Sequence, residues 1–217
     1  DPFDIPFADL PKELIVFPLP GALLLPQGRL PLNIFEPRYL NMVEDALGQQ
    51  RLIGMVQTRD PHEGLVPEQS DLFDVGCAGR IVSFSETSDG RIALSLEGVC
   101  RFRILSEAEG RRGYRRMNVD FAPFEADTED SDWTLDRASF MPVLKRYLEA
   151  RGIDVEWKAI EAAPDRLLIS SLGMMCPFDL KEKQALIEAA GLSEMTDLMR
   201  SLMEMAAHGG EQSTAKH

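Results

Sequence analysis

Residues 17–47 read FPLPGALLLPQGRLPLNIFEPRYLNMVEDAL, and this stretch decides how the first part of the chain folds. Prolines and glycines divide its apolar residues into short segments, a pattern typical of short strands joined by tight turns. A helix is predicted to begin at Pro37, because proline suits the first helical position, where its missing N–H costs nothing. Apolar side chains then recur at helical spacing until Gly48, a natural stop signal. The stretch therefore predicts strands that lead directly into an amphipathic helix.

The β-rich region extends on both sides of this stretch, to about residue 121. Ser88-Asp89-Gly90 separates two segments of alternating apolar and polar residues, and Asp-Gly is a strong signal for a β-hairpin. Gly98 interrupts the alternation, which indicates a bulge or a sharp bend. Because no long helical crossover separates the strands, we expect an antiparallel, barrel-like sheet. The predicted strands are Leu14–Phe17, Leu23–Leu25, Leu30–Phe35, Leu52–Gln57, the two hairpin arms within 75–105, and Tyr114–Phe121, with an exposed loop over Arg59–Asp74.

The composition changes after the last predicted strand. Residues 120–136 contain seven acidic residues and no basic one. Like charges repel one another and such a segment buries little apolar area, so residues 122–136 are predicted to form a mobile acidic linker. A calcium-binding loop is the other interpretation, but it needs alternating Asp or Asn and a glycine at fixed spacing, which this segment lacks.

From Leu135 onward the apolar residues follow a helical period. We therefore expect an α+β protein: a β-barrel subdomain over residues 1–121, a helical bundle over 137–208 and a disordered tail over 209–217. Met195, Met199 and Met203 recur with leucines on one face and are predicted to lie in the core of the bundle. The predicted helices are Leu135–Ala150, Trp157–Ala162, Asp165–Met174, Phe178–Ala190 and Ser193–Ala207.

The bulk composition is that of an ordinary globular protein, with 217 residues of which 44% are hydrophobic. No apolar run approaches the roughly 18 residues that span a bilayer, and no signal-peptide pattern opens the chain. We therefore expect a cytoplasmic location without membrane contact. The three cysteines, Cys77, Cys100 and Cys176, are odd in number and widely spaced, which argues against a disulfide framework and a zinc site. Cys100 alternates with apolar neighbours and is predicted to be buried.

A net charge of −13 opposes general nucleic-acid binding, which depends on neutralising phosphates. One region departs from this acidic average, and there a charged, solvated hairpin edge is favoured over an RNA-binding patch. Its basic residues are Arg101, Arg103, Arg111, Arg112, Arg115 and Arg116.

Motifs of common enzymes are missing from the sequence. It has no glycine-rich phosphate loop and no G-x-S-x-G nucleophile elbow. His62-Glu63 begins like a zinc-protease motif, but no second histidine follows at the required spacing. Composition alone does not exclude Ser-Lys catalysis, although no motif brings such a pair together. We therefore expect no enzymatic activity, no cofactor and no metal.

Several segments, in order along the chain, resemble the N-terminal domain family of Lon proteases, also called the LON substrate-binding domain. The similar segments are FPLPGALLLP, IFEPRYLNMVEDAL, VGCAGRI, EGVCRFRIL and DLKEKQALIEA. The resemblance extends from about Leu14 to Met205, and it implies a small PUA-like β-barrel followed by a helical subdomain. In Lon itself, this domain helps to engage unfolded or tagged polypeptides, and ATPase and Ser-Lys peptidase domains follow it. The chain is most similar to short, stand-alone bacterial members that lack those domains.

The function expected from this resemblance is non-catalytic binding of unfolded or tagged polypeptide, or of another protein partner. Candidate contact residues are Phe35, Met174, Met175 and Phe178. The segment Leu172–Phe178 is apolar and joins two predicted helices, so it either lines a cleft between bundle and barrel or belongs to the core. The alternatives are a PUA-like RNA-binding module, a structural adaptor between proteins and an uncharacterised hydrolase. The client and the oligomeric state stay open.

Glu36-Pro37-Arg38-Tyr39 also allows two interpretations. The residues form either a recognition edge or a local structural unit in which Glu36 and Pro37 start the helix, Tyr39 packs beneath it and Arg38 pairs nearby. The structural interpretation is favoured, because it explains each residue type.

Overall fold

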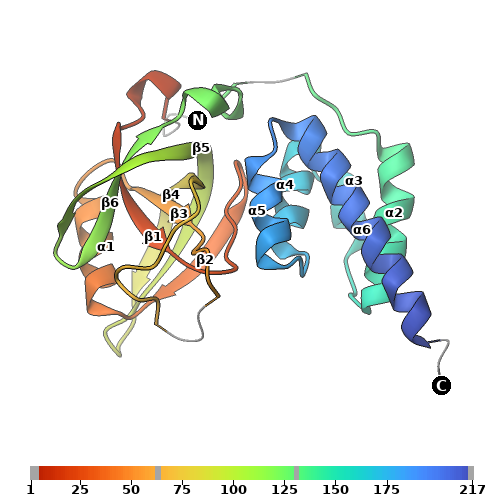
Figure 1. Cartoon of the computed structure of the whole chain (residues 1–217), viewed down its shortest axis with the longest axis horizontal. Coiled ribbons are helices and arrows are strands. Elements are labelled where there is room, and N and C mark those ends of the chain that lie inside the picture. The colour runs from red at the N-terminus through yellow and green to blue at the C-terminus, as the bar shows by residue number, and fades with distance from the viewer. Residues whose placement is uncertain (1–4, 62–64, 130–131, 215–217) are drawn as a thin grey trace.

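The computed structural model describes residues 5–61, 65–129 and 132–214, with side chains up to Ala207. Figure 1 shows two halves: a sheet half formed by residues up to 129 and a helical half formed by residues from 132. The strands are β1 (Glu13–Pro18), β2 (Arg29–Ile34), β3 (Leu52–Val56), β4 (Val75–Glu86), β5 (Ile92–Arg111) and β6 (Tyr114–Asp120). The helices are α1 (Pro37–Leu47), α2 (Arg137–Arg151), α3 (Trp157–Ala162), α4 (Asp165–Met175), α5 (Leu180–Glu188) and α6 (Leu192–Thr214), with the short 3-10 helices η1 (Phe7–Asp9) and η2 (Ala122–Asp127).

The six strands form one sheet in the order β2-β5-β4-β3-β1-β6. The long strand β5 pairs with β2 and β4 along its first part and with β6 along its second part, so β5, β4, β3, β1 and β6 pair in a closed ring. All pairs are antiparallel except β1 and β3, which run parallel. The expectation of a purely antiparallel sheet is wrong at this pair. Its physical cause is the crossover through β2 and α1, which lets the chain return to the sheet in the same direction.

The predicted hairpin and bulge are both present. Strands β4 and β5 are joined by residues 87–91, in which Gly90 has a φ of 78° that favours glycine. Ala78 pairs with Cys100 and Gly79 with Gly98, so Val99 is the extra residue of a β-bulge. A Cβ atom at Gly98 would lie 2.0 Å from the carbonyl oxygen of Leu25. The glycine therefore allows the preceding loop to approach the sheet closely.

The predicted strand Leu23–Leu25 is wrong: these residues form an irregular loop with exposed fractions of at most 2%. Neighbouring backbone groups of this loop bind the sheet, since Gln27 N–H donates to Gly98 O at 2.7 Å and Gly98 N–H donates to Gly28 O at 2.9 Å. The run of leucines thus reflects burial between the two halves rather than strand pairing, because Leu24 lies close to Gly79 on β4 and Leu25 lies close to Gly173 on α4.

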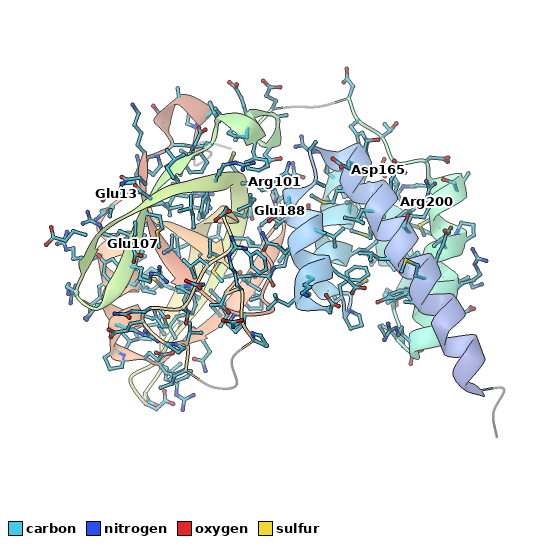
Figure 2. The ribbon with its side chains drawn as sticks, viewed as in Figure 1. Glu13, Arg101, Glu107, Asp165, Glu188 and Arg200 are labelled. Carbon is cyan, nitrogen blue, oxygen red and sulfur yellow. The ribbon has the colours of Figure 1, made fainter. Side chains whose placement is uncertain are left out.

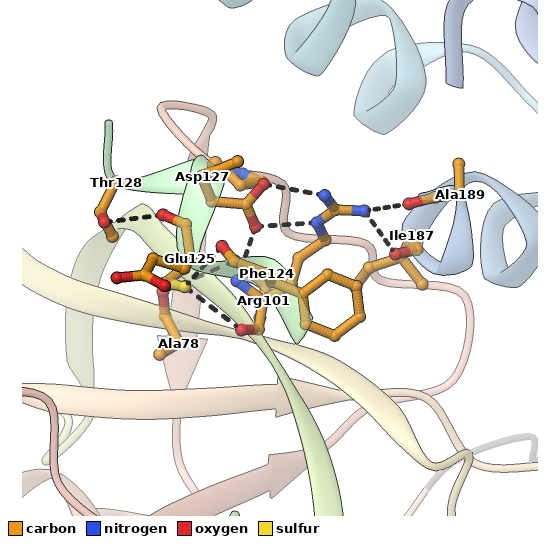
Figure 3. A network of polar contacts seen from close by, with 12 residues as sticks. Ala78, Arg101, Phe124, Glu125, Asp127, Thr128, Ile187 and Ala189 are labelled. Carbon is orange, nitrogen blue, oxygen red and sulfur yellow. Dashed lines mark hydrogen bonds and ion pairs between the residues drawn. The ribbon is translucent and has the colours of Figure 1, made fainter. Parts of the chain in front are cut away.

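The segment 122–136, predicted as a mobile acidic linker, begins with the short helix η2. Phe124 is only 5% exposed, and the carboxylate of Asp127 accepts hydrogen bonds from the buried Arg101 on β5 (Figure 3). This ion pair neutralises one of the seven acids of residues 120–136. Residues 130 and 131 lie outside the described residues. At the other end of the chain, α6 continues to Thr214, and residues 215–217 lie outside the described residues. The predicted disordered tail over 209–217 stays a prediction.

The helical half contacts the sheet half through α4 and α5, with α6 and α2 farther out (Figure 1). Ser170 on α4 donates to Pro26 O at 2.7 Å, and Gln184 on α5 donates to Val75 O at 3.2 Å. Gln57 on the sheet side donates to Gln184 Oε1 at 3.0 Å. The predicted core positions Met195, Met199 and Met203 are confirmed, since each is at most 2% exposed. The division into a subdomain at 1–121, a linker at 122–136 and a bundle at 137–208 stays a prediction.

Candidate functional site

The side chains of the apolar segment Leu172–Phe178 lie in different environments, and only some of them line a groove. Met174 is half-buried against the loop of the sheet half. A Cβ atom added at Gly28 would lie only 2.3 Å from the sulfur of Met174. Phe178 is 7% exposed and stacks on Tyr147, with ring centroids 6.0 Å apart. Met175, between them, is 82% exposed. Met174 and Phe178 therefore pack within the protein, whereas Met175 and Pro177 are exposed, and Met175 is the one of the two that lines a groove.

Met175 lies on a groove of about 450 Å³ in the helical half, which we call the Met175 groove. The C-terminal end of α2, residues 153–156, α3 and α4 form its walls. This volume falls within the roughly 300–1,000 Å³ typical of ligand-binding sites. Apolar side chains dominate the lining, including Leu148, Ile160, Ala163, Leu168, Leu172 and Met175.

The local sequence explains why the groove is open. Gly152 ends α2 in the left-handed conformation, with a φ of 64°, and the chain then continues without helix or strand to Glu156, whose backbone is extended. The following helix, α3, is only six residues long and contains no fully buried residue. It ends at Ala162, because Ala163 precedes Pro164 and the residue before a proline is disfavoured in helical conformation. So short a helix covers the apolar faces of α2 and α4 incompletely.

Cys176 lies at the inner wall of the same groove and is 4% exposed. Burial raises the pKa of its thiol to about 12, although the nearby Lys183 acts in the opposite direction. The thiol is therefore protonated at neutral pH, whereas nucleophilic and metal-binding cysteines act as thiolates. Cys77 and Cys100 are also buried and free, as the sequence predicts for Cys100.

A second apolar groove, the Phe35 groove, lies on the sheet half and has a volume of about 280 Å³. Phe35 is 54% exposed and Leu65 is 63% exposed, and both line it. Phe17 and Tyr39 also line it, with ring centroids 4.4 Å apart. Phe35 and Met175 therefore lie on different elements, and these two candidate contact residues do not form one site.

The segment Glu36-Pro37-Arg38-Tyr39 has local structural contacts. The guanidinium of Arg38 forms an ion pair with Glu36 at 2.8 Å and also donates to Val66 O. Glu36 occupies the N-cap position of α1, but its carboxylate makes no hydrogen bond to the helix N–H groups. Tyr39 is 4% exposed, and burial raises its pKa to about 12. The predicted pairing of Arg38 is present. Glu36 starts the helix through its backbone conformation, without a capping hydrogen bond from its side chain.

Most arginines of the basic region have carboxylate partners, several of which lie on the sheet half in Figure 2. Arg101, predicted to be solvated, is instead 3% exposed, because its charge is neutralised by Asp127. The other pairs are Arg111 with Asp45 (3.4 Å), Arg112 with Asp45 and Glu44 (2.8 Å each), Arg115 with Glu107 (2.7 Å) and Arg116 with Glu13 (2.7 Å).

The comparison to protein families identifies the family of this chain. The model of the ATP-dependent protease La (LON) substrate-binding domain matches residues 13–205. The chain belongs to this family. The sequence-based resemblance is therefore confirmed, and we refer to the protein as a LON domain.

Full-length relatives of this LON domain are proteases. It is 25% identical to the Lon protease of Dictyoglomus thermophilum over 198 residues, which are 86% of this chain and 23% of that protein. It is 31% identical to Lon protease 2 of Sorangium cellulosum over 109 residues, which are 50% of this chain and 13% of that protein. The LON domain thus spans less than a quarter of the length of either relative.

Two solved structures show the same α+β fold. The Lon N-terminal domain protein from Xanthomonas campestris is similar with a TM-score of 0.58 at 21% identity, covering 88% of this chain and 97% of that one. The N-terminal domain of Lon protease from the Mycobacterium avium complex gives a TM-score of 0.62 at 16% identity, covering 89% and 98%.

Two parts of the candidate site were missed by the sequence interpretation. The contribution of α2 and α3 to the Met175 groove depends on how three helices pack, and no local pattern shows it. Asp154 and Glu156 alternate with Ile153 and Val155 in the sequence, which could have indicated that the two acids are exposed. A pattern of four residues is too short to support such a prediction. Among the described residues, no helix is long and apolar enough to cross a membrane, and no group of potential metal ligands is present.

Proposed function

We propose that this LON domain is a non-catalytic module that binds unfolded or tagged segments of polypeptide. The family supports substrate binding in general terms. The observation that supports polypeptide in particular is the Met175 groove: an open, apolar groove with a methionine that is 82% exposed at its edge. Apolar side chains exposed by an unfolded chain are ligands of suitable chemistry for such a surface. The closed ring of strands is, in this proposal, the PUA-like barrel that supports the helical half.

The physical chemistry of methionine suits clients of varied sequence. Its side chain is unbranched and polarizable, so it adapts to partners of different shape. Burying one apolar side chain contributes about 1.5–3 kcal/mol, and a groove that takes two or three of them must still offset the cost of ordering the bound segment. The expected affinity is therefore weak, with a Kd in the micromolar range or above.

Binding of fluorescently labelled casein, an unfolded protein, tests this proposal by fluorescence anisotropy. Met175→Asp should weaken binding at least fivefold, because a carboxylate at the edge of the groove disfavours apolar side chains. Met205→Asp is the matched control: Met205 is 70% exposed on α6 and does not line the groove. Equal affinities for the wild type and both variants, or no binding of casein at all, would contradict the proposal.

The same experiment separates the alternatives. A structural adaptor would bind a folded partner and ignore casein. A hydrolase would cleave casein, and we expect no cleavage and no ATP hydrolysis. Activity that disappears when one of this chain's own residues is mutated would overturn that expectation. No specific observation favours RNA binding, because most of the arginines that would contact phosphates are paired with carboxylates. The cytoplasmic location remains an expectation from the sequence.

A further inference from the structure

Two carboxylates stand on the rim of the Met175 groove. Asp154 and Glu156 belong to the segment that joins α2 and α3, and both line the groove. In an extended chain, successive side chains point to opposite sides. Ile153 and Val155 are accordingly half-buried, whereas Asp154 and Glu156 are exposed. The segment therefore presents apolar side chains to the interior of the groove and negative charge to its rim.

Among the residues that the structure describes, no basic side chain forms an ion pair with Asp154 or Glu156. The residues that line the groove include no lysine, arginine or histidine. Glu156 occupies the N-cap position of α3, yet its side chain makes no hydrogen bond to the helix. Lys158, two residues after Glu156, is exposed on α3 and forms no ion pair with either carboxylate in the described part of the chain. Arg151, three residues before Asp154, places its guanidinium over the ring of Tyr147, 5.7 Å from the centroid. Both carboxylates are thus available to a cation that a bound chain supplies.

We propose that the Met175 groove selects apolar segments that are flanked by lysine or arginine. This inference rests on the proposed function and names its substrate class. Apolar side chains of the client occupy the groove, and basic residues next to them lie beside Asp154 and Glu156. An acidic flank would be repelled at the same place, so the rim discriminates by repulsion as well as by attraction.

Two labelled peptides test the selection by fluorescence anisotropy at low salt. Both contain a central Leu-Leu-Phe-Leu run, and one has two lysines at each end where the other has two glutamates. Exposed ion pairs are individually weak, so the lysine peptide should bind about three- to tenfold more tightly. The difference should shrink as salt screens the charges.

The net charge of −13 favours any basic peptide, and a matched pair of variants separates this general attraction from the rim. D154N/E156Q removes both rim charges. E86Q/E109Q removes the same amount of charge from Glu86 and Glu109, which are exposed on β4 and β5 and do not line the groove. Because all four side chains are exposed, the melting temperatures of both variants should equal that of the wild type.

We expect D154N/E156Q to remove most of the preference for the lysine peptide and E86Q/E109Q to preserve most of it. Equal effects of the two variants would overturn the inference, because net charge would then explain the preference. Equal binding of both peptides by the wild type would also overturn it, while leaving polypeptide binding intact. If neither peptide nor casein binds, the proposed function fails together with the inference.

Discussion

Arg101 and Asp127, 26 residues apart in the chain, form a buried, two-pronged ion pair (Figure 3). Nε and Nη2 of Arg101 each donate to a different carboxylate oxygen of Asp127, both at 2.8 Å. Nη1 of the same guanidinium donates to the carbonyl oxygens of Ile187 and Ala189 at the end of α5. One side chain thus joins β5, η2 and α5, and the boundary between the two halves depends on it.

Removing the acid should be strongly destabilising. Asp127→Ala leaves the guanidinium buried without its counter-charge, which typically costs about 3–5 kcal/mol. The control is Glu97→Ala, which removes an exposed partner from the Arg29–Glu97 pair and should cost about 1 kcal/mol or less. Urea denaturation measures both free energies of unfolding. A loss below about 1 kcal/mol for Asp127→Ala would show that the pair does not stabilise the fold.

A second prediction concerns the close contact between Gly98, at the β-bulge, and the backbone of Leu25. Gly98→Ala places a methyl group 2.0 Å from Leu25 O, so the loop must move away from the sheet. Overpacking of this kind typically costs 1–3 kcal/mol, and here the backbone itself must shift, so we expect about 2 kcal/mol or more. Gly191→Ala is the matched control, because nothing lies within 4 Å of the added methyl group. Thermal melts that place both variants at the same temperature would contradict the close contact.

Asp45 gives a prediction about pH. The hydrogen bond from Tyr114 Oη, at 2.6 Å, is the main cause that holds the pKa of Asp45 below its usual value, and Arg112 adds to it. A pKa that is lower in the folded state stabilises the protein above the ordinary carboxyl range, and this stabilisation is lost as the pH falls through the folded value. Asp45→Asn should therefore be less stable than the wild type at pH 7, and the difference should shrink below about pH 4.

Urea denaturation at several pH values measures this dependence. Glu86→Gln is the control, since Glu86 is exposed and its loss should leave the pH profile unchanged. A gap between Asp45→Asn and the wild type that stays constant from pH 7 into the acid range would show that the charge of Asp45 does not contribute.

The pairing of arginines gives a prediction for the RNA-binding alternative. Arg112, Arg115 and Arg116 already contact carboxylates at 2.8 Å or less, and the net charge is −13. We expect no shift of a labelled single-stranded RNA in a gel at physiological salt. RNA binding that falls steeply with salt and disappears when these arginines become glutamine would revive the alternative.

Local turn chemistry explains how much of the fold the sequence could predict. The Asp-Gly hairpin, the helix from Pro37 and the bulge at Gly98 all depend on backbone preferences of single residues, and the structure contains them. The strand predicted at Leu23–Leu25 failed, because apolar runs signal burial and the pairing partner is not encoded locally. The prediction that Arg101 is solvated was wrong for a related reason. A buried arginine needs an acidic partner, and no sequence pattern around β5 shows that Asp127 supplies it.

The candidate site shows the same limit at finer scale. Met174 and Met175 are neighbours at the end of α4, and the residue type alone gives the same prediction for both. Successive residues of a helix point about 100° apart, so one packs against the sheet half while the other faces solvent. Which of the two faces outward depends on where α4 docks, through contacts such as that of Ser170 with Pro26. The sequence could therefore identify the apolar segment but not which of its two neighbouring methionines is exposed.

The most direct test of polypeptide binding at the Met175 groove uses the methionines themselves. The chain contains ten, and NMR spectra of ¹³C-labelled methionine methyl groups report on each separately. Unlabelled casein is added to saturation, and assignments come from single substitutions to leucine. We predict that the Met175 signal shifts or broadens, while the signals of exposed Met205 and buried Met199 stay in place. A Met175 signal that does not move when casein binds would contradict the account.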